Sequence, residues 1–136
     1  MRLLVDTNVV ISGLLGRHSV RGQLMQLWQA RQCQWLTCEQ QLIELTRVIQ
    51  SPFIASKVED SYGSTYAFML EFQAKTHHQV LEPPFEAVCR DPCDDYLIAM
   101  LTRFPADFLV TGDKDLLSLK PIYPKILTPR ELIDRL

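Results

Sequence analysis

Short, uniformly apolar runs alternate along this chain with longer segments whose apolar residues recur at helical spacing. A run that is apolar at every position is typical of a strand buried on both faces. Parallel strands need long crossover connections, which are usually helices. The alternation therefore predicts one α/β domain over residues 1–136, in which a central parallel sheet lies between two layers of helices.

The expected elements follow from apolar periodicity and from residues that favour helix ends. Strands are expected at residues 3–5, 34–37, 80–81 and 126–127, and in the apolar run that begins at Phe108. Helices are expected over residues 8–15, 20–31, 38–50, 53–75 and 91–104, with Gly63 dividing the fourth. A last helix is expected from Thr128, because Pro129 suits the first helical position.

Composition excludes several classes of protein. Hydrophobic residues make up 47% of the chain, and 14 basic against 16 acidic residues give a net charge of −2. This charge argues against coating nucleic acid by bulk attraction, although a local basic rim is compatible with it. No apolar run is long enough to span a bilayer, and Asp6 interrupts the first run too early for a signal peptide. A cytoplasmic protein without a membrane partner is therefore expected.

The cysteines do not indicate a metal site. Their spacings, C-x4-C and C-x3-C, differ from the C-x2-C pair that is common in structural zinc sites. In a reducing compartment they are expected to be free thiols. They are Cys33, Cys38, Cys89 and Cys93.

Two aspartates follow expected strands. Asp6 comes directly after the first, and Asp113 comes after the turn that ends "FLVTG". Sites in such sheets form at the carboxyl ends of the strands, so both side chains are expected at one edge. A carboxylate that interrupts a buried apolar run is costly unless it is paired or binds a cation.

The segment "DPCDD" begins an expected helix, and local structure can explain most of its acids. Asp91 suits the N-cap, Pro92 the first helical position and Asp94 the third position of a capping box. Asp95 then has no local role and is expected to be the free carboxylate at the same sheet edge.

Two further acids have more than one interpretation. Glu44 lies outside the apolar stripe of its helix, so alone it is most simply a solvated side chain. Asp115 is either a ligand or the N-cap of a short turn. Carboxylates gathered without lysine or arginine between them repel one another unless cations neutralise them. Oxygen ligands favour Mg²⁺ or Mn²⁺, which support phosphoester chemistry.

The segments "VDTNVVISGLL", "RDPCDDYLIAM" and "LVTGDKDLL", with Glu44 on a helix between them, resemble the PIN-domain family over essentially the whole chain. The chain is most similar to small prokaryotic PIN proteins that are assigned as toxins of toxin–antitoxin pairs. The resemblance implies a three-layer α/β/α domain that binds Mg²⁺ or Mn²⁺. Cys93 departs from the pattern, because many relatives have another acid there.

The resemblance also implies roles for individual residues. The acidic, catalytic metal ligands would be Asp6, Glu44, Asp95 and Asp113, with Asp115 as the alternative fourth acid. Thr7, Asn8 and Thr111 would support them. The activity implied is a metal-dependent endoribonuclease, with an RNA substrate, an antitoxin as protein partner and a homodimer as its assembly. Basic residues near the motifs are candidates for holding RNA, namely Arg17, Arg21, Arg47, Arg90 and Lys114.

Two alternatives remain open from the sequence. The fold could be a catalytically idle scaffold that binds RNA or protein. An aspartyl-phosphate phosphatase or transferase also places an aspartate after its first strand, but that chemistry needs a second acid two residues later. Asn8 occupies that position, which argues against this class.

Overall fold

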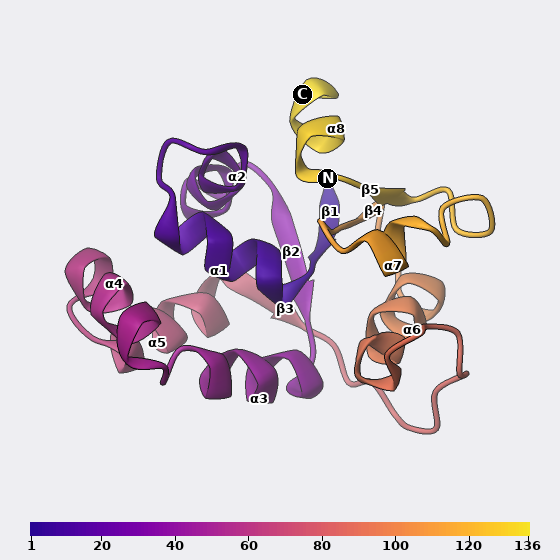
Figure 1. The fold of residues 1–136 in the computed structure, drawn as a ribbon, viewed down its shortest axis with the longest axis horizontal. Helices are drawn as coiled ribbons and strands as arrows, with labels where there is room; N and C mark the ends of the chain where they lie inside the picture. The colour runs from indigo at the N-terminus through magenta and orange to yellow at the C-terminus, as the bar shows by residue number, and fades with distance from the viewer.

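Five parallel strands form the centre of the molecule, which a computed structural model describes over residues 1–136 (Figure 1). Their order in the sheet is β3-β2-β1-β4-β5. The strands are β1 (Arg2–Val5), β2 (Gln34–Thr37), β3 (Thr76–His78), β4 (Phe108–Val110) and β5 (Ile126–Leu127). The chain thus builds one half of the sheet outward from β1 through β2, and the other half outward through β4.

Helices connect the strands, and none of them combines the length and apolarity needed to cross a membrane. They are α1 (Thr7–Leu15), α2 (Val20–Gln29), α3 (Glu39–Val48), α4 (Pro52–Tyr62), α5 (Thr65–Lys75), α6 (Asp95–Arg103), α7 (Lys114–Leu117) and α8 (Pro129–Asp134). Gly63 separates α4 from α5 with a positive φ of 88°, a conformation that favours glycine. Thr128 and Glu131 form a complete capping box at α8.

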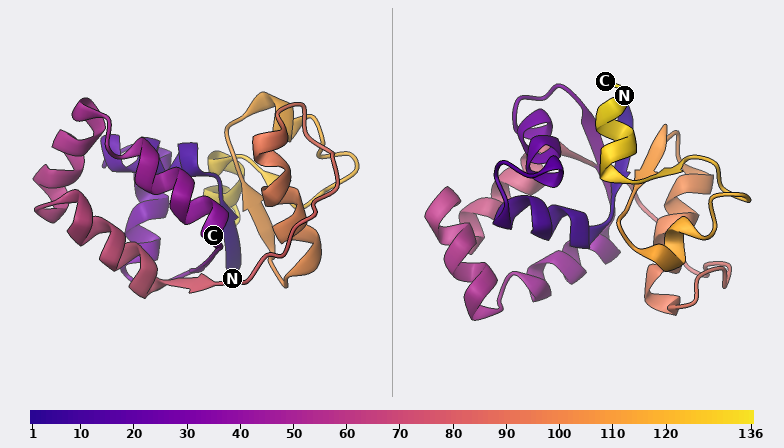
Figure 2. Two further views of the ribbon diagram at one scale, coloured as in Figure 1. Left: turned by 90° about the horizontal axis from the view of Figure 1, so that it is seen from below. Right: turned by 45° about the horizontal axis from the view of Figure 1, so that its top comes forward.

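The two faces of the sheet bury different side chains, because alternate residues of a strand point to opposite sides. Leu3 and Val5 contribute to the core beneath α1, α2, α3, α4, α5 and α8. Leu4 and Leu109 contribute to a second core beneath α6 and α7. Figures 1 and 2 show these two groups of helices on opposite sides of the sheet. The expected three-layer α/β/α fold is confirmed.

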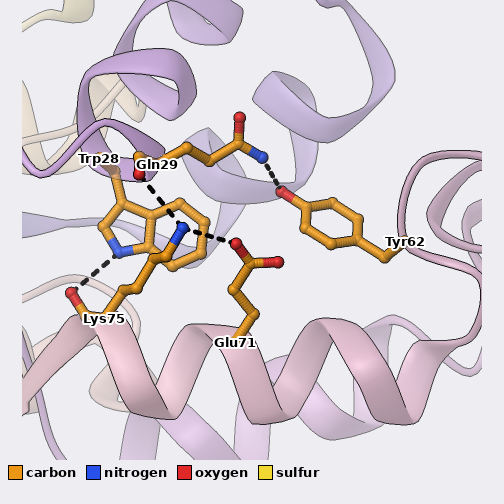
Figure 3. A network of polar contacts seen from close by, with 5 residues as sticks. All are labelled: Trp28, Gln29, Tyr62, Glu71 and Lys75. Carbon is orange, nitrogen blue, oxygen red and sulfur yellow. Dashed lines mark hydrogen bonds and ion pairs between the residues drawn. The ribbon is translucent and has the colours of Figure 1, made fainter.

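Aromatic packing and a polar network hold α2 against α5, at a distance from the edge where Asp6 lies. The Trp28 ring stacks on Trp35 with centroids 5.3 Å apart. Its indole Nε1 donates to the Lys75 carbonyl oxygen at 3.2 Å, and Lys75 Nζ donates to Glu71 Oε1 at 2.7 Å (Figure 3). The fully buried indole therefore has the polar partner that such a group needs.

The prediction of a strand at residues 80–81 is wrong. The third strand in the chain is β3, whose residues Thr76, His77 and His78 pair with β2. It is an edge strand in which both histidines are exposed, so it needs no apolar run and gave no such signal in the sequence. Leu81 is buried instead from a loop, and Val80 is exposed.

Candidate functional site

The centre of the sheet brings two acidic turns together. β1 and β4 are neighbours, and the chain continues from them in opposite directions across the sheet. In open α/β sheets, ligands bind beyond the carboxyl ends of the strands at such a point. Asp6 follows β1 and Asp113 follows β4 by three residues, so both lie there.

A threonine connects these two turns. Thr111 Oγ1 donates to Asp6 Oδ2 at 2.8 Å and accepts the backbone N–H of Asp113 at 3.0 Å. Asp6 is buried and caps α1, where its Oδ1 accepts the backbone N–H of Asn8 at 3.4 Å. Burial is the main reason that the pKa of Asp6 is raised, and the charges of Glu44 and Asp113 raise it further. Asp6 is therefore a carboxylate that a nearby cation would stabilise.

The residues after Asp6 occupy two environments. Thr7 is buried, and its hydroxyl lies beside that of Tyr96. The Asn8 side chain is exposed, so its contribution to Asp6 comes through its backbone N–H.

Asp113 and Asp115 occupy different positions although they are two residues apart. Asp113 caps α7, accepting the Asp115 backbone N–H at 2.8 Å, and its charge acts on Asp6 and Asp94. Asp115 is half exposed, and one of its oxygens lies 3.8 Å from Arg90 Nη1. The geometry therefore favours Asp113 as the fourth acid.

Glu44 reaches the same region from α3. Tyr96 Oη donates to Glu44 Oε1 at 3.2 Å, and the charge of Glu44 acts on both Asp6 and Asp94. Burial, followed by the Glu44 charge, raises the pKa of Tyr96, so this phenol stays protonated and remains a donor. Glu44 is therefore oriented toward the other acids and is not simply solvated.

Buried Gln41 connects the first turn of α3 to β1 and β2. Its Nε2 donates to the Val5 carbonyl oxygen at 2.6 Å, and its Oε1 accepts the Thr37 hydroxyl at 2.7 Å. Since Glu44 follows on the same helix, this contact aligns Glu44 with the end of β1. Sequence reasoning missed both Gln41 and Tyr96. The only signal for them was a polar group in a segment that otherwise forms part of the core.

The roles expected for Asp94 and Asp95 are exchanged. Asp91 caps the helix start as expected, accepting the Cys93 N–H at 2.9 Å, but Asp94 makes no capping hydrogen bond. Asp95 is not fully free, because its Oδ1 accepts the backbone N–H groups of Val88 at 3.1 Å and Cys89 at 2.7 Å, which leaves only its Oδ2 without a hydrogen bond in the protein. These bonds, with that of Cys89 first, lower the pKa of Asp95.

Asp94 has the environment expected for Asp95. Its pKa is raised to about 6, first by burial and then by the charges of Asp6, Asp91, Asp113 and Glu44. The physical reason for the exchange is a 3₁₀ turn, Pro92–Asp94, before α6. A 3₁₀ turn has three residues per turn instead of 3.6, so it rotates the side chains relative to a continuous α-helix.

The raised pKa of Asp94 predicts a pH dependence of stability in protein freed of metal by EDTA. The folded state binds this proton more tightly than the unfolded state, so stability falls as the pH rises from about 4 to about 6. Asp94→Asn should be more stable than wild type at neutral pH by about 1 kcal/mol, a figure reduced for partial solvent exposure. Urea unfolding of both proteins across this range measures the difference, and equal pH profiles would contradict the prediction.

The set Asp6, Glu44, Asp94 and Asp113 fits a hard divalent cation by its chemistry. All donors are oxygen, and no lysine or arginine forms an ion pair with any of them. No three acidic, histidine or cysteine side chains are close enough to share one ion as they stand. Binding would therefore need these side chains to move closer together.

Comparison with known proteins agrees with this architecture. A family model described as "PIN domain" matches residues 2–115, which include all four acids of the set. The chain is also 28% identical over 145 residues to an uncharacterized protein of Methanocaldococcus jannaschii, covering 98% of this chain and 90% of that protein. No solved structure matches the chain significantly. The extent of the family match shows that this chain belongs to the PIN-domain family.

Proposed function

We propose that this protein is a Mg²⁺- or Mn²⁺-dependent endoribonuclease. Membership of the PIN-domain family supports a nuclease function in general. The observation that carries the finer proposal is the gathering of Asp6, Glu44, Asp94 and Asp113 from four separate segments, without a basic partner. The repulsion among these four carboxylates destabilises the folded protein, and a bound divalent cation would relieve it.

In this proposal Asp6, Asp94 and Asp113 hold the ion, with Glu44 completing the site. Thr111 keeps Asp6 and Asp113 in register, and Tyr96 orients Glu44 through the hydrogen bond from its hydroxyl. When bound, a divalent ion lowers the pKa of water and offsets negative charge on phosphate oxygens.

One observation favours the alternative of an idle PIN scaffold. No three ligands are close enough to share an ion, so the acids could remain apart. In that case Mn²⁺ would leave the melting temperature unchanged, whereas a protein that binds the ion in its folded state must be stabilised. A thermal melt with and without Mn²⁺ separates the two proposals.

Cleavage of end-labelled RNAs of mixed sequence and structure tests the activity. Incubation with Mn²⁺ or Mg²⁺ should produce internal cuts, and EDTA should prevent them. An identically purified Asp6→Asn protein should be inactive, which excludes a contaminating nuclease. The absence of both cleavage and stabilisation by Mn²⁺ would refute the enzymatic proposal.

The proposed biological role is that of a cytoplasmic toxin controlled by an antitoxin. The resemblance to assigned toxins supports it, and the four free cysteines suit a reducing compartment. Exposed Phe53 on α4, with Tyr66 and Leu70 one turn apart on α5, supports a protein partner or a homodimer. Induced expression should arrest growth with the wild-type chain and not with Asp6→Asn.

A further inference from the structure

A basic cavity adjoins the acidic set on the side of β4. It has a volume of about 300 Å³ and lies between the first turn of α2, the turn after β4 and the start of α8. Arg21, Gly112 and Arg130 are among the residues that line it, and no carboxylate is among them. Gly112 directly precedes Asp113, so the cavity and the acidic set share one turn of the chain.

Packing holds Arg21 in this cavity. Its guanidinium lies against Gly112, where a Cβ atom would come within 2.1 Å of Arg21 Nη2. The side chain is half-buried, yet it forms no ion pair and donates no hydrogen bond within the protein. A guanidinium has five N–H donors in a planar fork, so Arg21 is positioned with its donors free.

Arg130 adds a second charge from the start of α8. It is exposed and also lacks an ion pair. The arginine fork matches the geometry of phosphate oxygens, and two such groups in a cavity without carboxylates favour an anion. Because Gly112 joins this cavity to Asp113, an RNA whose scissile phosphate lies at the proposed metal site would place a neighbouring phosphate here, so a chain of phosphates is a better match than an isolated anion.

We propose that Arg21 and Arg130 form a subsite for an RNA backbone phosphate next to the phosphodiester that is cleaved. This inference rests on the proposed ribonuclease function. Arg21 is the main contact and is held in position by Gly112, while Arg130 strengthens the local field. The subsite would set the direction in which RNA crosses the sheet edge, since it lies on the β4 side of the acids and not on the β2 side.

Direct RNA binding tests the subsite independently of cleavage. The probe is a short, fluorescein-labelled single-stranded RNA of mixed sequence, measured by anisotropy in EDTA over a range of salt concentrations. Arg21→Met keeps the length of the side chain and should weaken binding about tenfold, with a salt slope smaller by about one. Arg31→Met is the matched control, since Arg31 precedes β2 at the opposite end of the strands, and it should bind as wild type does.

Gly112→Ala tests the positioning without removing a charge. Its methyl group would displace the flexible end of Arg21, so the variant should fold normally and still bind RNA more weakly. In cleavage assays both variants should raise KM with little change in kcat, because they alter binding more than chemistry. Their stabilisation by Mn²⁺ should equal that of wild type.

The outcomes separate the subsite from the enzymatic proposal. Wild-type cleavage together with unchanged RNA affinity in Arg21→Met would overturn the subsite and leave the nuclease intact. Weaker binding by Arg21→Met, with neither cleavage by wild type nor its stabilisation by Mn²⁺, would support an RNA-binding subsite and overturn the activity. Equal competition by polyglutamate and by unlabelled RNA would also overturn the subsite, because it would indicate an unspecific anion patch.

Discussion

Asp94→Asn is expected to lower metal-dependent RNA cleavage by about 100-fold or more while leaving the protein folded. Asp94 is the acid of the "DPCDD" segment that faces Asp6, Glu44 and Asp113, and their charges contribute to a pKa of about 6. Its carboxylate makes no hydrogen bond within the protein, so asparagine breaks no contact there. The loss should therefore come from the site and not from misfolding.

The measurement combines initial rates of RNA cleavage with thermal melts, each over a range of Mn²⁺ concentrations. Asp94→Asn should lose most of the stabilisation that Mn²⁺ gives the wild type. Asp134→Asn is the matched control, because Asp134 is an exposed acid at the end of α8. Full activity and normal Mn²⁺ stabilisation in Asp94→Asn would show that Asp94 is not a ligand.

Most of the fold follows from signals that are local in the sequence. The strand over residues 34–37, the division at Gly63 and the start of α8 all occur where turn and cap residues predict them. β3 could not be predicted in this way, because its pairing partner β2 lies about forty residues earlier and its own side chains are polar. Such an edge strand depends on tertiary pairing and carries no apolar pattern.

In the candidate site, too, some positions follow from local sequence signals and others depend on tertiary contacts. The positions of Asp6 and Asp113 follow from strand ends, which the sequence marks clearly. Which of Asp94 and Asp95 faces the other acids depends instead on whether the turn before α6 is α-helical or 3₁₀. The capping pattern in the sequence is compatible with a local role for either acid. Gln41 and Tyr96 act through contacts to distant segments, so a polar group within a core segment was their only local signal, and it did not show what they contact.

Asp95→Ala is expected to lower the free energy of unfolding by about 2–4 kcal/mol, since two backbone N–H groups lose a charged acceptor. The buried carboxylate joins α6 to the loop at Val88 and Cys89. The pKa of Asp95 is lowered, whereas that of Asp94 is raised, so the two acids have opposite effects on how stability depends on pH. The stabilisation by Asp95 is complete above its unfolded pKa and is lost as the pH falls through its folded pKa. Urea unfolding at neutral pH measures the change, with Asp134→Ala as the control.

Asp95→Asn separates a structural role of Asp95 from a role as metal ligand, because it keeps an oxygen acceptor while removing the charge. It should be destabilised less than Asp95→Ala and, where it remains folded, should cleave RNA within a few-fold of wild type. Its stabilisation by Mn²⁺ should also persist. If Asp95→Asn instead abolished the Mn²⁺ response with little loss of stability, and Asp94→Asn did not, the third ligand would be Asp95. Because both hydrogen bonds from Val88 and Cys89 go to Oδ1, the metal would then bind through Oδ2.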